Sequence, residues 1–128
     1  MNQVNTPNLF FVGASAATLA TDGFACVDST GELVTPAVAT GLKTIGTLVV
    51  GSEGMPSDQA NGSARFEVRI GRQLVLAVND ETDPVTVAHI GASCYVKDSH
   101  TVSSDNTGTS VAGVVKGFQG TKVLVQIN

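Results

Sequence analysis

An internal self-similarity constrains the fold most: the last third of the sequence resembles a second copy of an earlier stretch. In both copies a cysteine follows a glycine by three residues, and another glycine lies in a later apolar run. These residues are Gly23, Cys26 and Gly46 in the first copy, and Gly91, Cys94 and Gly113 in the second. Such self-similarity is typical of a repeated structural unit. The alternative is that a composition rich in valine and glycine produces the match.

The predicted pseudo-repeats cover about residues 23–70 and 91–128. Residues 65–70 match residues 122–127 in pattern if the first copy carries about ten extra residues ahead of them. The glycine-rich segment 51–63 buries little and is the expected site of that insertion, as an exposed loop. Each copy would then consist of three strands separated by a long loop and a turn.

The residue types and their alternation predict an all-β protein. Valine occurs 19 times against eight leucines, and β-branched residues favour strands. Residues 65–70 alternate charged and apolar side chains, which is typical of a half-buried strand. At 128 residues, one domain is the simplest expectation. We therefore expect a small β-barrel or β-sandwich spanning residues 23–128, preceded by residues 1–22 as an N-terminal arm or first strand.

The apolar cluster near the N-terminus provides the candidate partner contacts, which are Leu9, Phe10, Phe11 and Val12. No basic residue precedes this cluster, so a secretory signal is not expected. Adjacent residues of an extended chain face opposite sides. One phenylalanine is therefore expected to point into the core while the other meets a partner.

Low charge also indicates a partner-covered surface. Charged residues make up 14% of the chain, against about 25% in ordinary soluble domains. The alternative is a thick β core with a serine-, threonine- and glycine-rich surface. A net charge of −4 with seven lysines and arginines disfavours nucleic-acid binding. No apolar run is long enough to span a membrane as a helix, so no membrane partner is expected.

Two cysteines are too few for a disulfide framework, and their spacing does not match a zinc site. We expect Cys26 and Cys94 to be small buried apolar residues, with a disulfide as the alternative. Free thiols would indicate folding in a reducing compartment.

No constellation of residues predicts catalysis, and neither a cofactor nor a metal is expected. Asp98, Ser99 and His100 are consecutive in an extended segment, so they cannot form a hydrogen-bonded triad and are interpreted as turn residues. The acidic cluster of Asp80, Glu81 and Asp83 lacks the spacing of a calcium loop. The alternating charges of residues 65–70 predict a cross-strand salt-bridge face.

An ordered set of short motifs in the second half resembles a known family. The motifs are Leu76-Ala-Val-Asn-Asp80, Asp83-Pro-Val-Thr86, His89-Ile-Gly-Ala-Ser-Cys-Tyr-Val-Lys-Asp98, His100-Thr-Val102 and Ser110-Val-Ala-Gly-Val-Val115. This set is similar to small head proteins of tailed phages and prophages, the capsid decoration or cement proteins. The resemblance covers about 50 residues well, and covers the first half only loosely through residues 23–34 and 45–46.

The resemblance implies a non-enzymatic structural protein on the outer surface of the virion capsid, assembled in the cytoplasm of a bacterial host. It also implies a major capsid protein as partner and self-association, commonly as a trimer. Two alternatives from other classes remain. The first is a phage tail or head-fibre component that binds a host-surface ligand. The second is a metal-dependent hydrolase using Asp80, Glu81, Asp83 and His100.

Overall fold

The computed structural model describes residues 8–14, 17–52 and 65–127, and it confirms the predicted all-β class. A 3-10 turn, η3 (Val87–His89), lies between two of the strands. No helix among these residues is long and apolar enough to span a membrane. The strands are β1 (Leu9–Val12), β2 (Phe24–Val27), β3 (Leu33–Val34), β4 (Lys43–Leu48), β5 (Arg65–Ile70), β6 (Gln73–Asn79), β7 (Ser93–Val96), β8 (Thr101–Ser103), β9 (Val111–Gln119) and β10 (Lys122–Ile127).

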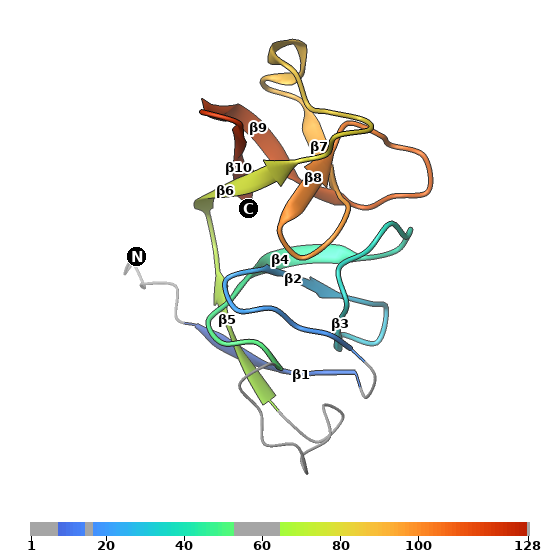
Figure 1. Cartoon of the computed structure of the whole chain (residues 1–128). Coiled ribbons are helices and arrows are strands. Elements are labelled where there is room, and N and C mark those ends of the chain that lie inside the picture. The colour runs from blue at the N-terminus through green and yellow to red at the C-terminus, as the bar shows by residue number, and fades with distance from the viewer. Residues whose placement is uncertain (1–7, 15–16, 53–64, 128) are drawn as a thin grey trace, which may run out of the picture.

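The strands form two sheets that lie one above the other in Figure 1. The first half of the chain forms a five-stranded sheet in the order β1-β5-β4-β2-β3. The second half forms a closed barrel in the order β10-β6-β8-β7-β9. The chain passes from the first sheet to the barrel between β5 and β6, where Gly71 adopts a positive φ of 90°. Glycine adopts this backbone conformation without steric penalty.

The two sheets have the same connectivity. When the barrel is written from β6, its order is β6-β10-β9-β7-β8, so each strand of the first sheet has a counterpart five strands later. The parallel pairing of β6 with β8 closes the barrel. The first sheet carries one bridge at the corresponding place, a parallel one between Gly13 and Leu33. Among the described residues, each half thus contributes five strands, where the sequence predicted three.

The strand registers extend this correspondence to single residues. Leu48 pairs with Val68 in the first sheet, and Val115 pairs with Val125 in the barrel. Val115 follows Leu48 by 67 positions, whereas Val125 follows Val68 by 57. The difference of ten residues lies between β4 and β5, where the sequence predicted an insertion. Residues 53–64 of this segment lie outside the described residues.

Glycine is required at one equivalent position in each sheet. A Cβ atom on Gly46 would collide with the carbonyl oxygen of Arg69, and a Cβ atom on Gly113 would collide with that of Gln126. Each glycine lies beside a register shift, between β2 and β4 in one sheet and between β7 and β9 in the other. Strands that approach this closely at a bulge leave no room for a side chain.

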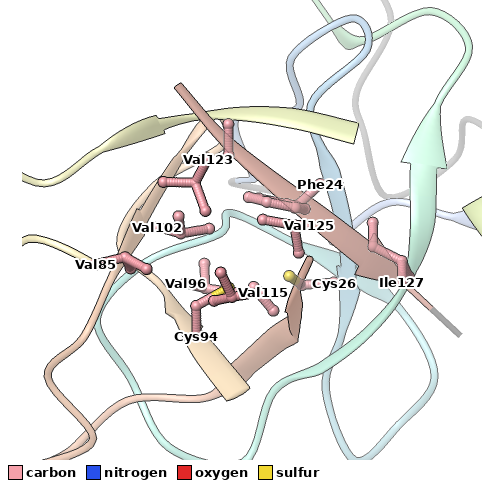
Figure 2. Packing of buried hydrophobic residues seen from close by; sticks show 12 residues of the cluster. Phe24, Cys26, Val85, Cys94, Val96, Val102, Val115, Val123, Val125 and Ile127 are labelled. Carbon is pink, nitrogen blue, oxygen red and sulfur yellow. The ribbon is translucent and has the colours of Figure 1, made fainter. Parts of the chain in front are cut away.

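Strand β2 is buried along its whole length because it contributes to two cores. Ala25 and Val27 pack in the core of the first sheet, with Leu33, Leu48, Phe66 and Val68 among their neighbours. Phe24 and Cys26 face the other way and pack in the core of the barrel, as Figure 2 shows. The two halves therefore share an apolar interface, and β2 contributes side chains to the cores on both of its sides.

Polar contacts add to this interface. The hydroxyl of buried Ser110 donates to the carbonyl oxygen of Ala39 at 2.6 Å and accepts from the N–H of Leu42 at 3.0 Å. The Thr44 hydroxyl donates to the carbonyl oxygen of Val111 at 3.0 Å. The two Ser110 bonds satisfy a buried hydroxyl that would otherwise destabilise the fold. Together the three bonds hold β4 and the loop before it against the start of β9.

Candidate partner-contact surface

The candidate contact residues Leu9, Phe10, Phe11 and Val12 form β1, which pairs antiparallel with β5. Phe11 lies opposite Phe66 and packs against the core of the first sheet. Phe10 lies opposite Glu67, and 59% of its surface is exposed. The two phenylalanines thus face opposite sides, as the alternation predicted, and Phe10 is the one available to a partner.

A hollow of about 260 Å³ lies beside Phe10 on the outer side of β1 and β5. The segment 49–51 forms one wall, and it is held there by a bond from the Val49 N–H to the Glu67 carbonyl oxygen at 3.0 Å. The lining residues are Phe10, Val49, Val50, Gly51, Arg65, Phe66 and Glu67. Small-molecule pockets begin at roughly 300 Å³ and are more enclosed. The hollow is therefore slightly smaller than the usual small-molecule pocket.

Polar groups border this apolar surface. The Asn8 amide donates to the Glu67 carboxylate at 2.8 Å, and Arg69 forms an ion pair with Asp22 at 2.9 Å. Arg69 thus pairs with a turn residue, and not with a neighbouring strand as the predicted cross-strand face required. An apolar centre with a polar border is the usual anatomy of a protein contact.

The acidic cluster forms a structural turn. The buried carboxylate of Asp80 accepts from the Lys97 ammonium and from the N–H groups of Thr82 and Asp83, at 3.2 and 3.3 Å. The hydrogen bond from Lys97 lowers the pKa of Asp80, and the same bond raises the pKa of Lys97. The cation already satisfies Asp80, so this carboxylate is not free to bind a substrate.

The rest of the hypothetical hydrolase set lies at the surface. Glu81, Asp83 and His100 are exposed. No group of three or more histidine, cysteine, aspartate or glutamate side chains in the described ranges is placed to hold a metal ion. Asp98 accepts from the His100 backbone N–H at 3.0 Å, so the Asp98-Ser99-His100 segment is a turn, as predicted.

Both cysteines are free and buried, as the sequence predicted, and no disulfide joins them. Burial raises the pKa of the Cys94 thiol to about 11 and also raises that of Cys26. The Cys94 thiol lies 3.7 Å from the Gly113 carbonyl oxygen, and the Cys26 thiol lies 3.5 Å from the Thr44 hydroxyl. Both behave as small apolar core residues.

A second exposed apolar surface was not predicted. Leu74, Leu76 and Val78 project outward from β6 and are 58%, 46% and 45% exposed, respectively. The registers of β1 and β6 make Leu76 the counterpart of Phe10. This correspondence is the signal that could have identified the surface, because it places an outward apolar residue at the same site of both repeats.

No family model matches this chain, and neither the curated proteins nor the solved structures contain a significant match. The fold and the surface define a two-sheet β protein with exposed apolar strands.

Proposed function

We propose that this protein is a structural component of a tailed-phage virion that decorates the outer surface of the capsid and stabilises it by bridging major capsid protein subunits. The observation that carries this proposal is the exposed Phe10 beside an apolar hollow on a strand fixed to the core. The motif resemblance of the second half provides the phage context.

The chemistry of the surface fits adhesion. Full burial of a phenylalanine side chain contributes about 1.5–3 kcal/mol, and aromatic residues in central pockets dominate protein interfaces. Phe10 extends from a paired strand, so its placement requires little ordering on binding, which reduces the entropic cost. Phe10 is therefore the proposed anchor, with Val49 and Val50 beside it in the hollow.

Stabilisation would follow from mass action. A protein that binds the assembled lattice better than free subunits shifts the equilibrium toward the lattice. This role requires a rigid body and apolar contact area, and it requires no reactive group. A fold of paired strands around shared cores meets the requirement for rigidity.

The variant Phe10→Asp tests the proposed anchor. It places a charge in the contact and should weaken binding to purified capsids that lack this protein, by roughly 30-fold or more. The control Val38→Asp alters another exposed apolar residue, in the loop between β3 and β4, and should bind normally. Urea unfolding of both variants checks that each is folded. Equal binding by Phe10→Asp and wild type would contradict the proposal.

A deletion of residues 1–12 is a less specific test. It would remove β1 from the sheet and Phe11 from the core, so a loss of binding could follow from a loss of stability. The single substitution at Phe10 avoids this ambiguity because the side chain points outward.

A further inference from the structure

Strand β6 carries an outward apolar stripe made of Leu74, Leu76 and Val78. The alternate residues Val75 and Ala77 pack inward against the barrel core. On the neighbouring strand β10, half-buried Leu124 lies opposite Leu76, Gln126 lies opposite Leu74, and Lys122 lies opposite Val78. The outward residues of β10 beside Leu74 and Leu76 are therefore uncharged, and only Val78 has a charged neighbour there, Lys122.

The same part of β6 has an open backbone edge. Strand β8 pairs with β6 only at Val78 and Asn79. The Val78 N–H bonds to the His100 carbonyl oxygen on the β8 side, at 2.7 Å. Backbone groups of an antiparallel strand alternate in direction, so the N–H and C=O groups of Leu74 and Leu76 point to that side too. No strand among the described residues pairs with them there.

An open strand edge is a template for pairing with another strand. Each edge of this kind presents two N–H donors and two C=O acceptors, from Leu74 and Leu76. An antiparallel copy of β6 would place Leu74 opposite Leu76 of the second chain and satisfy all four groups on each side. The edge is thus complementary to itself.

The charges around β6 also favour an antiparallel copy. No residue from Gln73 to Asn79 is charged, so no like charges meet along the strand. Exposed Arg72 precedes β6, and exposed Glu81 and Asp83 follow it. Asp80 and Lys97 at that end neutralise each other, and Lys122 only partly offsets the remaining carboxylates. Antiparallel pairing brings the positive start of one strand toward the negative end of the other.

The equivalent edge of the first sheet is less suited to such pairing. The registers make Asn8 the counterpart of Leu74, and the Asn8 side chain is already bonded to Glu67. The outward apolar stripe of β1 is therefore shorter than that of β6. The ends of β1 are also not flanked by opposite charges, as β6 is by Arg72 and Glu81.

We propose that β6 forms an antiparallel contact with β6 of a second copy of this chain, around a two-fold axis, with Leu74 opposite the second copy's Leu76. The contact joins two barrels into one continuous sheet. It is independent of what Phe10 binds, so the proposed function can fail without affecting it.

Directed cross-linking tests the register. Residues directly opposite in a hydrogen-bonded pair have Cα atoms about 5.5 Å apart, within disulfide range. Diagonal neighbours lie about 7–8 Å apart, at or beyond the limit. Under mild oxidation, a mixture of Leu74→Cys and Leu76→Cys chains should form covalent dimers. Each variant alone, and the wild type with its two buried thiols, should form little.

Analytical ultracentrifugation tests the contact without oxidation. The wild type should sediment as a concentration-dependent dimer, and Leu76→Lys should raise the dissociation constant at least tenfold. Arg72→Glu and Glu81→Arg should each weaken the dimer by at most about fivefold, and the double variant should recover part of the loss. Circular dichroism of each variant checks that the substitution leaves the fold intact.

Three results would overturn the proposal. The first is a wild-type monomer at all concentrations. The second is a wild-type trimer, which the family resemblance implies, because a contact around a two-fold axis joins chains in pairs. The third is efficient cross-linking of Leu74→Cys with itself, which would require another register.

Discussion

Cys26 and Cys94 lie in one core cluster, although they project from opposite faces of equivalent strands. The registers pair Ala25 with Gly46 and Cys94 with Gly113, so Ala25 is the counterpart of Cys94. Cys94 points into its own barrel, whereas Cys26 points out of its own sheet and into that barrel. The sequence match of the two cysteines was therefore wrong by one residue. In a strand, one residue exchanges the two faces.

The shared core predicts that Phe24 connects the two halves. Its counterpart in the barrel is Ser93, which is only half-buried. Phe24→Ala should cost about 3–5 kcal/mol of unfolding free energy, because it removes a large buried side chain. The exposed control Val38→Ala should change stability by less than about 0.5 kcal/mol. Urea unfolding followed by circular dichroism measures both, and a small loss for Phe24→Ala would refute a shared core.

The paired glycines predict matched sensitivity to a single methyl group. Gly46→Ala and Gly113→Ala should each destabilise by about 1–3 kcal/mol or more, because the new Cβ atom collides with a backbone carbonyl. Gly117 lies in the same strand as Gly113 but has open space around it. Gly117→Ala should therefore change stability by at most about 0.5 kcal/mol. Thermal unfolding compares the three variants. A large difference between Gly46→Ala and Gly113→Ala would contradict the equivalence of the bulges, and an equal loss in Gly117→Ala would contradict the role of the close approach.

The buried thiols predict slow chemical modification. With a pKa of about 11, about one Cys94 thiol in a thousand is ionised at pH 8, and only the thiolate reacts. Both cysteines should react with Ellman's reagent at least tenfold more slowly in the folded protein than in urea. Rapid modification of the folded chain would show that the barrel core opens.

The Asp80–Lys97 pair predicts a specific pH dependence. Because the pKa of Asp80 is lowered in the folded state, its contribution is present above about pH 4 and is lost as the pH falls through the folded value. Asp80→Asn should therefore destabilise at pH 7, and its difference from wild type should narrow in acid. The raised pKa of Lys97 gives a contribution that is present below about pH 10.4 and is lost at higher pH.

Urea unfolding at a series of pH values measures this difference. Glu81→Gln is the control, because Glu81 is exposed and neighbours Asp80. It should follow the wild-type profile. A constant gap between Asp80→Asn and wild type down to pH 2.5 would contradict the assigned ion pair.

The sequence predicted those features that depend on local pattern. The alternation of residues 65–70 and the preference for valine over leucine identified the all-β class, because strand periodicity is a property of neighbouring residues. Phe10 and Phe11 were assigned to opposite faces for the same reason. The buried state of the cysteines followed from their place at the start of apolar runs.

Features that depend on which strands pair with each other could not be predicted from the sequence. All residues from Leu74 to Val78 are apolar, which is typical of a strand buried on both faces. Only the packing of β6 in the barrel, with Val75 and Ala77 against the core, shows that the alternate residues Leu74, Leu76 and Val78 are exposed. Strands β3 and β8 are two and three residues long, too short to produce a periodic signal, so each half was predicted with too few strands.

The most direct test of the central claim is the copy number of this protein in purified, DNA-filled phage particles, measured by quantitative mass spectrometry. A decoration protein should be present in a number comparable to that of the major capsid protein, and it should remain with heads separated from tails. Absence from mature heads, or a few copies confined to the tail, would contradict the account.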